Sequence, residues 1–351
     1  MKIIVDIQHP AHVHYFKYFI EEMEKKGHQI LVTASDKDIS KILLDLYNMP
    51  YILLGSYGKG IIRKAINIPI MDYKMLRVAR RFNPDLFVGF SPIRASHCSR
   101  ILRKKTIGID DTEYAIFEHV LYRPFIDIIL TPACFQKDFG KKQQRFNGTT
   151  DLLYLHPNRF TPNSHVLEEL NLTLDDTFFI VRFVSWDANH DIGVTGIRDK
   201  VSFIRHLEKY GRVLITSEAE LPTELSHLQI SISPEKIHDV MAHATLFVGE
   251  SGTMATESAT LGVHSVVINP EAIQDDGKYT FGVFEHLHSY GLLDAYSDER
   301  KALCRVDELL DDIAKLKAEG HKKKRELLER SDDVTEWLIR AVEEAYSESV
   351  R

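Results

Sequence analysis

Cysteine is scarce in this sequence, and its spacing excludes two kinds of small, cross-linked domain. Among 351 residues there are three cysteines, Cys98, Cys134 and Cys304, and no two of them form a Cys-x-x-Cys pair. A disulfide framework needs several cysteines that can pair, and a zinc ribbon needs closely spaced pairs of them. We therefore expect neither in this chain.

Long apolar runs and an excess of positive charge are also absent. No run approaches the roughly 20 apolar residues of a membrane-spanning helix. The opening residues, MKIIVDIQHP, contain an acid and a proline and are typical of a strand rather than a signal peptide. The formal net charge is −7, whereas a domain dedicated to nucleic acid is usually basic. We therefore expect a cytoplasmic protein with no nucleic-acid partner.

The residues that are present are typical of a globular α/β protein with two domains. Hydrophobic residues make up 44% of the chain and charged residues 27%, and the length is sufficient for two hydrophobic cores. Apolar runs of strand length alternate with helical patterns, beginning with 2–7, 29–33 and 50–54. This alternation predicts doubly wound parallel sheets.

Prolines in the segment 155–162, LHPNRFTP, interrupt both periodicities and indicate a linker. Two local details are also expected, a weak strand near 229–232 and a solvated turn between helices at the basic run 322–325. The expected segments are an N-terminal domain, a C-terminal domain and a final helix, over 1–157, 163–330 and 331–351.

The stretch from Leu246 to Asn269 is the most informative part of the chain. Two apolar, β-branched runs flank a small-residue turn and a helical pattern, which predicts a parallel crossover unit. Ser251 and Thr253 favour a helix N-terminus, and Gly252 lets a ligand approach the backbone. The first N–H groups of such a helix are suited to bind phosphate.

Glu257 follows one helical turn later in the same pattern. A carboxylate there would face the same crevice, where it could accept hydrogen bonds from the two hydroxyls of a ribose. Phosphate donors followed by a diol acceptor suggest a nucleotide. The alternative is an ordinary helix start followed by an ordinary acid on the helix surface, and spacing does not separate the two interpretations.

The same stretch resembles the nucleotide-diphosphate site of GT-B enzymes, especially that of the non-hydrolysing UDP-N-acetylglucosamine 2-epimerases. Their motif runs Ser-Gly-Gly, three residues, Glu, and later Leu-Gly-Lys-Pro. Here Ser251-Gly252-Thr253, Glu257 and Leu261-Gly262 fall into register. The chain departs in having Thr253 for the second glycine and Val263-His264 for Lys-Pro. As a whole, it resembles an uncharacterised GT-B-like family found mainly in archaea.

This resemblance implies two Rossmann-like domains that face each other across a cleft, with the final helix crossing back to the N-terminal domain. The nucleotide-diphosphate sugar would be a substrate, so no cofactor is expected. No metal is expected either, because a helix terminus and a basic side chain can carry the charge of the diphosphate. The residues expected to bind the nucleotide sugar are Arg182, Ser251, Gly252, Thr253, Glu257 and Asp275.

Candidate catalytic residues follow strands of the N-terminal domain. His9 and His12 come after the first strand and could act as acid or base, whereas no acid or cysteine is spaced to complete a metal site with them. Asp110, Asp111 and Glu113 come after a later strand. Like charges this close raise at least one pKa, which suits a general base. The alternative is an exposed acidic turn.

Residues 57–81 carry seven basic side chains against one acid, with isoleucines interleaved. One interpretation is a loop and an amphipathic helix with a solvated basic face. The other is a membrane-surface patch, because GT-B transferases that use lipid-linked acceptors carry such a patch in this half.

We expect a glycosyltransferase-like enzyme that uses a nucleotide-diphosphate sugar, with a UDP-sugar favoured and a lipid-linked or glycan acceptor allowed by the resemblance. Non-hydrolysing 2-epimerisation is the alternative reaction. A non-catalytic nucleotide-sugar-binding protein is the alternative from another class.

Overall fold

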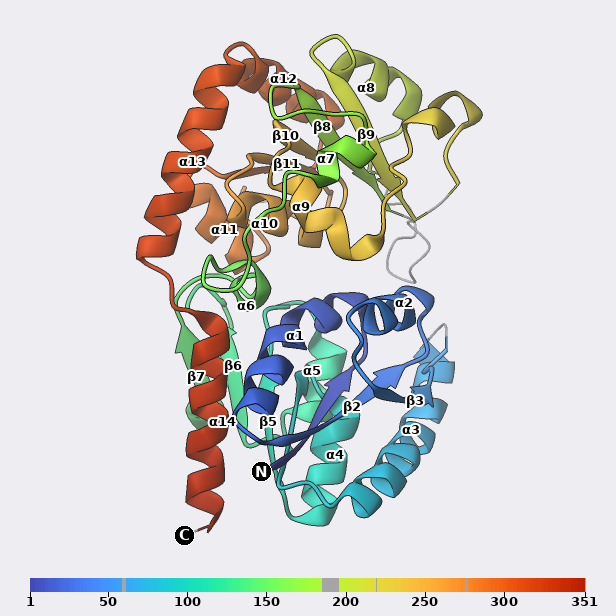
Figure 1. The fold of residues 1–351 in the computed structure, drawn as a ribbon, viewed down its shortest axis with the longest axis vertical. Helices are drawn as coiled ribbons and strands as arrows, with labels where there is room; N and C mark the ends of the chain where they lie inside the picture. The colour runs from blue at the N-terminus through green and yellow to red at the C-terminus, as the bar shows by residue number, and fades with distance from the viewer. Residues whose placement is uncertain (59–60, 185–195, 219, 275–276, 351) are drawn as a thin grey trace. The chain divides into compact units, whose positions relative to one another are not determined.

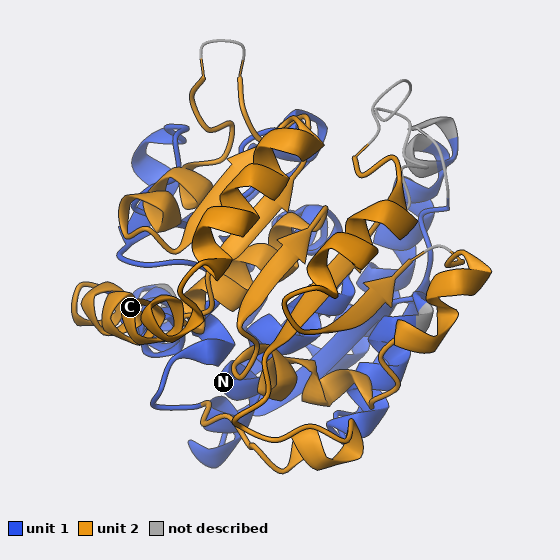
Figure 2. Cartoon of the chain, turned by 90° about the horizontal axis from the view of Figure 1, so that it is seen from above, with its two compact units in different colours: residues 1–159, 331–351 blue, residues 160–330 orange. Residues whose placement is uncertain are grey.

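The computed structural model describes residues 1–58, 61–184, 196–218, 220–274 and 277–350 (Figure 1). The chain divides into two compact units, one comprising Met1–Arg159 with Ser331–Arg351 and the other Phe160–Arg330 (Figure 2). The division falls inside the proline-containing segment 155–162. Each unit is an α/β structure built on one parallel sheet.

The first unit is built on seven parallel strands in the order β3-β2-β1-β4-β5-β6-β7. The central strands β1 and β4 are buried almost throughout, which is typical of a parallel sheet with helices on both faces. The strands are Lys2–Ile7 (β1), Gln29–Ser35 (β2), Tyr51–Gly55 (β3), Leu86–Phe90 (β4), Lys105–Ile109 (β5), Ile128–Pro132 (β6) and Gln143–Phe146 (β7).

Helices of the first unit cover the two faces of this sheet. They are Pro10–Lys25 (α1), Asp38–Leu46 (α2), Ile61–Phe82 (α3), Ile93–Leu102 (α4), Ile116–Tyr122 (α5), Leu152–Leu155 (α6) and Val334–Val350 (α14), with a 3-10 turn at Gly140–Lys142 (η1). On one face, Met71 and Met75 of α3 and Cys98 of α4 share a core with Ile4 and Phe87 of the strands. On the other face, α1 packs with α2, α6 and α14.

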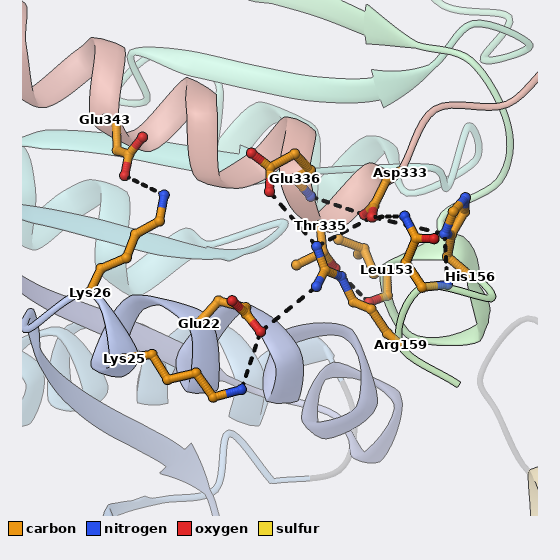
Figure 3. A network of polar contacts seen from close by, with 11 residues as sticks. Glu22, Lys25, Lys26, Leu153, His156, Arg159, Asp333, Thr335, Glu336 and Glu343 are labelled. Carbon is orange, nitrogen blue, oxygen red and sulfur yellow. Dashed lines mark hydrogen bonds and ion pairs between the residues drawn. The ribbon is translucent and has the colours of Figure 1, made fainter. Parts of the chain in front are cut away.

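The final helix α14 is attached to the first unit by polar contacts as well as by its buried apolar face (Figure 3). Thr335 Oγ1 donates a hydrogen bond to the Leu153 carbonyl at 2.6 Å, and Lys26 Nζ lies 2.7 Å from Glu343 Oε1. Just before the helix, Asp333 accepts from the side chain of Asn158. These contacts fix the C-terminal segment to α1 and to the residues that precede the linker.

The second unit is built on five parallel strands in the order β12-β11-β10-β8-β9. The strands are Phe178–Phe183 (β8), Arg212–Ser217 (β9), Leu246–Gly249 (β10), Ser265–Ile268 (β11) and Leu293–Tyr296 (β12). The helices are Val166–Glu169 (α7), Lys200–Leu207 (α8), Ile237–Met241 (α9), Gly252–Thr260 (α10), Gly282–Ser289 (α11), Glu299–Leu310 (α12) and Ile313–Glu329 (α13), with 3-10 turns at Thr223–Leu228 (η2) and Pro234–Lys236 (η3). α8 and α12 share the larger core of this unit with the strands.

Both sheets contain a point at which the strand order reverses. In the first unit the reversal lies between β1 and β4, and in the second between β8 and β10. Ligands of open parallel sheets bind outside the carboxyl ends of the strands at such points. The topology therefore indicates the loops after β1 and β4 and those after β8 and β10. The predicted fold class, two doubly wound parallel sheets, is confirmed.

Two local predictions were wrong. Residues 229–232 form no strand, and Gln229 makes only an isolated bridge to Ile215. The basic run 322–325 lies inside α13 instead of in a turn. Acids one turn away on both sides support the helix there, because Lys322 is paired with Glu326 and Lys323 with Glu319 at i,i+4 spacing.

Gly249, the last residue of β10, generates the first testable prediction. A Cβ at this position would lie 2.5 Å from the backbone oxygen of Arg182 on β8, which cannot rotate away. Gly249→Ala should therefore lower the free energy of unfolding by about 1–3 kcal/mol, as overpacking does. Urea unfolding monitored by circular dichroism measures the change.

The control for this prediction is Gly252→Ala, where the new methyl group would meet mainly the end of the Phe284 ring, at 3.2 Å. The control should lose much less stability because a ring can shift and a backbone carbonyl cannot. Equal losses would show that the close approach of β10 to β8 is not what requires glycine.

Candidate functional site

The N-terminus of α10 lies at the switch point of the second sheet. Ser251 caps the helix from an extended conformation, and its Oγ accepts a hydrogen bond from the Met254 N–H at 3.3 Å. The first N–H groups of a helix have no intrahelical acceptor and carry the positive end of its dipole. Thr253 is exposed, and Ser251 and Gly252 are half-buried, so an anion can reach this turn.

Two aromatic rings from the start of α11 border the same turn. Phe284 packs against Gly252 so closely that a Cβ there would lie 3.2 Å from its ring. Phe281, which is half-buried, meets Phe284 edge to face with ring centroids 5.1 Å apart. Glycine at position 252 therefore lets the helix start lie directly against an aromatic surface.

Glu257 lies one turn into α10, but it is buried rather than at a crevice surface. Its side chain is 6% exposed, and Oε1 lies 3.1 Å from Nε2 of His238 on α9. A buried carboxylate requires such a partner, because an unpaired charge in the interior is costly. His238, which sequence analysis did not single out, therefore fixes the direction of the Glu257 carboxylate.

Arg182 brings a positive charge to the same edge of the sheet from β8. Its Nη2 donates to Glu218 Oε1 at 2.7 Å, in a pair whose side chains are 21% and 46% exposed. Exposed pairs of this kind contribute about 0–1 kcal/mol, so Arg182 can exchange Glu218 for a stronger anion at little cost. Asp275 lies outside the described residues.

Glu250, directly before Ser251, is a second residue that sequence analysis missed. Its Oε2 accepts from the Val184 N–H at 2.9 Å, and its Oε1 accepts from the Ile197 N–H at 2.7 Å. The residue is 2% exposed. Its carboxylate thereby ties the end of β8 to the segment before α8, next to the start of α10. The sequence signal for Glu250 is an acid immediately after a buried strand. A phosphate site gives no reason to select an acid, because a carboxylate repels phosphate.

In the first unit, His9 and His12 lie at the switch point beside β1. His9 is exposed and caps α1, with its Nδ1 accepting from the Ala11 N–H at 3.3 Å. His12 is 8% exposed, and its Nδ1 accepts from the Gln8 N–H at 3.3 Å. Burial, together with the nearby positive charges, lowers the pKa of His12 well below its ordinary value. His12 is therefore neutral, with its proton on Nε2, and is suited to donate a hydrogen bond.

A buried ion pair beneath these histidines was also missed. Arg94, at the start of α4, contacts both carboxylate oxygens of Asp6, and the closest distance is 2.7 Å from Nη2 to Oδ1. Both side chains are fully buried. The guanidinium also donates to the Ile7 carbonyl and to Ser35, while Gln8 donates to Asp6. The pair thus fixes the chain where it leaves β1 and approaches His9.

Asp110, after β5, is fully buried and is surrounded by donors rather than exposed in an acidic turn. Tyr122 and Ser91 donate to its Oδ2, the Thr112 N–H donates to its Oδ1, and His119 Nε2 lies 3.1 Å from Oδ2. A carboxylate held by so many donors is suited to position the loop. Ser91, directly after β4, has a φ of 40°, a strained conformation that places its hydroxyl on the neighbouring loop.

Asp111 is the better placed of the two aspartates for proton transfer. Burial, and then the negative charges of Asp110 and Glu113, raise the pKa of Asp111 to about 6, although the nearby side chains of Thr150 and Thr112 oppose the shift. Sequence analysis predicted a raised pKa from like charges, whereas desolvation is the larger cause. A carboxylate with such a pKa is an effective base near neutral pH.

Within the described ranges, no group of three or more histidine, cysteine, aspartate or glutamate side chains is arranged to hold a metal ion. Among the helices that the structure describes, none has the length and apolar character needed to cross a membrane.

Sequence comparison places this chain in a family. The model of the family described as protein of unknown function (DUF354) matches residues 1–346. The chain belongs to the DUF354 family. The uncharacterised protein MJ0665 of Methanocaldococcus jannaschii is 22% identical over 302 residues, which cover 82% of this chain and 88% of that protein.

Two solved structures illustrate the fold that this family member shares with other proteins. The UDP-GlcNAc 2-epimerase of Neisseria meningitidis, bound to UDP-GlcNAc, has a TM-score of 0.67 at 11% identity and covers 98% of this chain and 100% of its own. The glycosyltransferase SsfS6 of Streptomyces sp. SF2575 has a TM-score of 0.61 at 12% identity and covers 98% of this chain and 99% of its own. At these identities the likeness establishes the GT-B-type fold and not the reaction.

The raised pKa of Asp111 generates a prediction about stability. The folded chain holds the Asp111 proton more tightly than the unfolded chain does, so this group lowers the free energy of unfolding as pH rises from about 4 to about 6. Asp111→Asn removes the charge, and the variant should therefore be more stable than the wild type at pH 8. The difference should shrink towards pH 4. Urea unfolding at several pH values measures it.

Asp176→Asn is the matched control, because hydrogen bonds from Thr173 lower the pKa of Asp176. That variant should show the opposite sign and be less stable than the wild type above pH 4. If Asp111→Asn instead destabilises the chain at pH 8, the carboxylate is a structural acceptor and not a candidate base.

Proposed function

We propose that the chain binds a nucleotide-diphosphate sugar and transfers its sugar to an acceptor, with a UDP-sugar as the favoured donor. The observation that carries this proposal is the start of α10, at the switch point of the second sheet. It combines N–H groups within reach of an anion with a carboxylate one turn later, at the buried Glu257. Phosphates would be held at Ser251–Thr253 and the ribose hydroxyls at Glu257.

Arg182 would support the departure of the diphosphate. In the transfer, the bond from the anomeric carbon to the diphosphate oxygen breaks, and a bond to the acceptor oxygen forms. The charge left on the diphosphate is stabilised by the dipole of α10 and by Arg182 once Arg182 releases Glu218. The donor is a substrate, so this reaction requires no cofactor.

The first unit would supply the groups that act on the acceptor. Asp111 would take the proton of the acceptor hydroxyl, because its raised pKa makes it a useful base near neutral pH. Neutral His12 would donate a hydrogen bond from Nε2, and the exposed His9 would contact the ligand at the start of α1. Asp110 would hold the loop that carries Asp111.

Epimerisation of the same nucleotide sugar is the second candidate function, and the fold likeness to a UDP-GlcNAc 2-epimerase favours it. Incubation with UDP-, GDP- and dTDP-sugars distinguishes the possibilities. Release of nucleoside diphosphate only with an added acceptor supports transfer, and an epimer formed without acceptor supports epimerisation. Tight binding without turnover would instead support a non-catalytic binding protein.

The helix start generates a prediction about binding. Thr253→Glu places a carboxylate on the exposed first turn of α10, where it interacts favourably with the helix dipole by about 0.3–1 kcal/mol. The melting temperature should therefore stay the same or rise. The new carboxylate repels phosphate, so the affinity for UDP should fall about tenfold or more. Calorimetric titration measures the affinity of each protein for UDP. The control variant Thr253→Ser, which keeps the turn neutral, should bind UDP as tightly as the wild type.

A Thr253→Glu variant that binds UDP as tightly as the wild type would contradict the proposed phosphate site at α10. Failure of the wild type to bind any nucleoside diphosphate at millimolar concentration would also contradict the proposed nucleotide binding.

The exposed side of α3 supports a membrane-borne source for the acceptor. Its outward residues recur at spacings of three and four, with apolar Ile66, Ile70 and Tyr73 followed by Arg77 and Arg80. Helices that lie on membrane surfaces combine apolar and basic side chains in this way. We therefore extend the proposal to a peripheral contact between α3 and anionic lipid, on which a lipid-linked acceptor would be presented.

Replacement of three exposed arginines of α3, Arg77, Arg80 and Arg81, by glutamate tests this contact. Co-sedimentation with phosphatidylglycerol vesicles should be lost, while the fold is kept because the side chains are exposed. The matched control replaces three exposed cations of α13, Lys315, Lys322 and Arg325, by glutamate and should still sediment. Absence of sedimentation by the wild type would mean that the basic face is only solvated.

A further inference from the structure

A basic pocket lies at the end of α4, away from the candidate site. α4 begins beside the switch point and runs back along the sheet for ten residues, about 15 Å at the usual helical rise. Beyond its last turn is a cavity of about 490 Å³. The residues that line it are Arg100, Arg103, Lys104, Lys105, Phe125 and Asp127.

The lining carries four cations and one acid. That acid, Asp127, uses Oδ2 to accept the Thr106 N–H at 2.8 Å and so serves the start of β5. Lys105 pairs at 2.8 Å with Glu348, whose side chain is 71% exposed, and such a surface pair is readily exchanged. Lysine and arginine side chains converging on one cavity form a site for phosphate.

Arg103 occupies a backbone position that an arginine does not favour. It has φ 57° and ψ 42°, in the left-handed region, directly after α4. The backbone bonds from Lys104 N–H to Ser99 O and from Arg103 N–H to Arg100 O form the hydrogen-bond pattern of a Schellman motif. In that motif the left-handed position is ordinarily glycine or asparagine, since a Cβ there is strained.

The other left-handed residues that follow helices in the described chain obey this preference. They are Gly27, Asn48, Asn83, Asn171, Gly262 and Gly291, after α1, α2, α3, α7, α10 and α11. Arg103, which follows α4, is the exception to this preference. Strain of this kind tends to be retained where the side chain has a function.

Compensation of the helix dipole does not explain the exception. Cations near a helix C-terminus are favourable, but they act from the last turn and do not require the left-handed position. In α1 the last residue, Lys25, and the next residue, Lys26, precede Gly27, and in α3 Arg80 and Arg81 of the last turn precede Asn83. Both helices thus combine cations with an unstrained cap, whereas α4 places a guanidinium on the cap itself, at the wall of the cavity.

We propose that this pocket binds the phosphate groups of a ligand that carries at least two of them. Arg100, Arg103 and Lys104 would contact the phosphate oxygens, and Phe125, which is 40% exposed, would provide an apolar surface for the rest of the ligand. The phosphates could belong to a free metabolite or to a lipid headgroup, since both present the same oxygens. The site lies on the first unit and does not depend on the proposed function.

The test uses pyrophosphate as the probe and Arg103→Gly as the variant. Glycine suits the left-handed position, so the variant should melt at the same temperature as its parent or higher, while its affinity for pyrophosphate falls about tenfold or more. Both proteins carry Thr253→Glu, so that phosphate binding at α10 does not contribute. Lys322→Gln, which removes an exposed cation from the second unit, is the matched control and should bind like the parent.

Vesicles of phosphatidylglycerol and phosphatidylcholine distinguish the two sources of phosphate when the parent and both variants also carry glutamate in place of Arg77, Arg80 and Arg81, which removes the vesicle binding proposed for α3. Loss of pyrophosphate binding in Arg103→Gly supports a free phosphorylated ligand, and loss of vesicle binding alone supports a lipid headgroup. The proposal is overturned if the parent binds neither probe. It is also overturned if Arg103→Gly binds both probes as tightly as Lys322→Gln does. A failure of UDP binding at α10 would leave this result unaffected.

Discussion

The described strands of both sheets all run parallel, and this constraint organises the rest of the structure. Because the strands are parallel, every loop that follows a strand lies at the same end of the sheet. At one point along this end, between two neighbouring strands, the strand order reverses. In the second unit the start of α10 lies at that reversal, and in the first unit His9 and His12 do. The same geometry sends the end of α4 to the opposite edge, where the basic pocket lies.

Buried carboxylates hold the loops at these edges in place. Asp6 is paired with Arg94, Asp110 accepts from Tyr122 and Ser91, and Glu250 joins the Val184 and Ile197 backbones. Glu257 is also buried, but it lies within α10 and contacts His238 of α9 instead of a loop. Removing one partner of a buried ion pair typically costs about 3–5 kcal/mol, so the Asp6–Arg94 pair strongly fixes the chain that follows β1. Asp111 differs in keeping a raised pKa, which favours a role in proton transfer over a role in support.

The central strands and the start of α10 could be predicted from the sequence because their signals are local. Continuous apolar runs mark β1, β4, β10 and β11, and a small-residue turn marks Ser251–Thr253. The edge strands β7 and β12 were missed, since Gln143–Phe146 is largely polar and Leu293–Tyr296 contains an acid. Burial of β1 and β4 on both faces made their pattern much stronger than that of strands at an edge.

The contacts around the candidate site could not be predicted in the same way. Asp6 and Arg94 are 88 residues apart, and neither residue type nor spacing reveals that pairing. Glu257 was predicted at its helical position, yet its burial depends on His238 from a different helix. The strain at Arg103 is likewise a property of backbone conformation that residue identity does not disclose.

In the proposed function, the second unit recognises a nucleotide through phosphate donors at the start of α10 and a ribose acceptor at Glu257. Calorimetric titration of the wild-type chain with UDP and with its 2′,3′-dideoxy analogue tests this claim most directly. Loss of two hydrogen bonds to a carboxylate should weaken binding of the analogue by about 2–3 kcal/mol, or roughly 30- to 150-fold. Equal affinities for the two nucleotides would contradict the claim, because a ribose held by Glu257 cannot lose both hydroxyls without a cost in affinity.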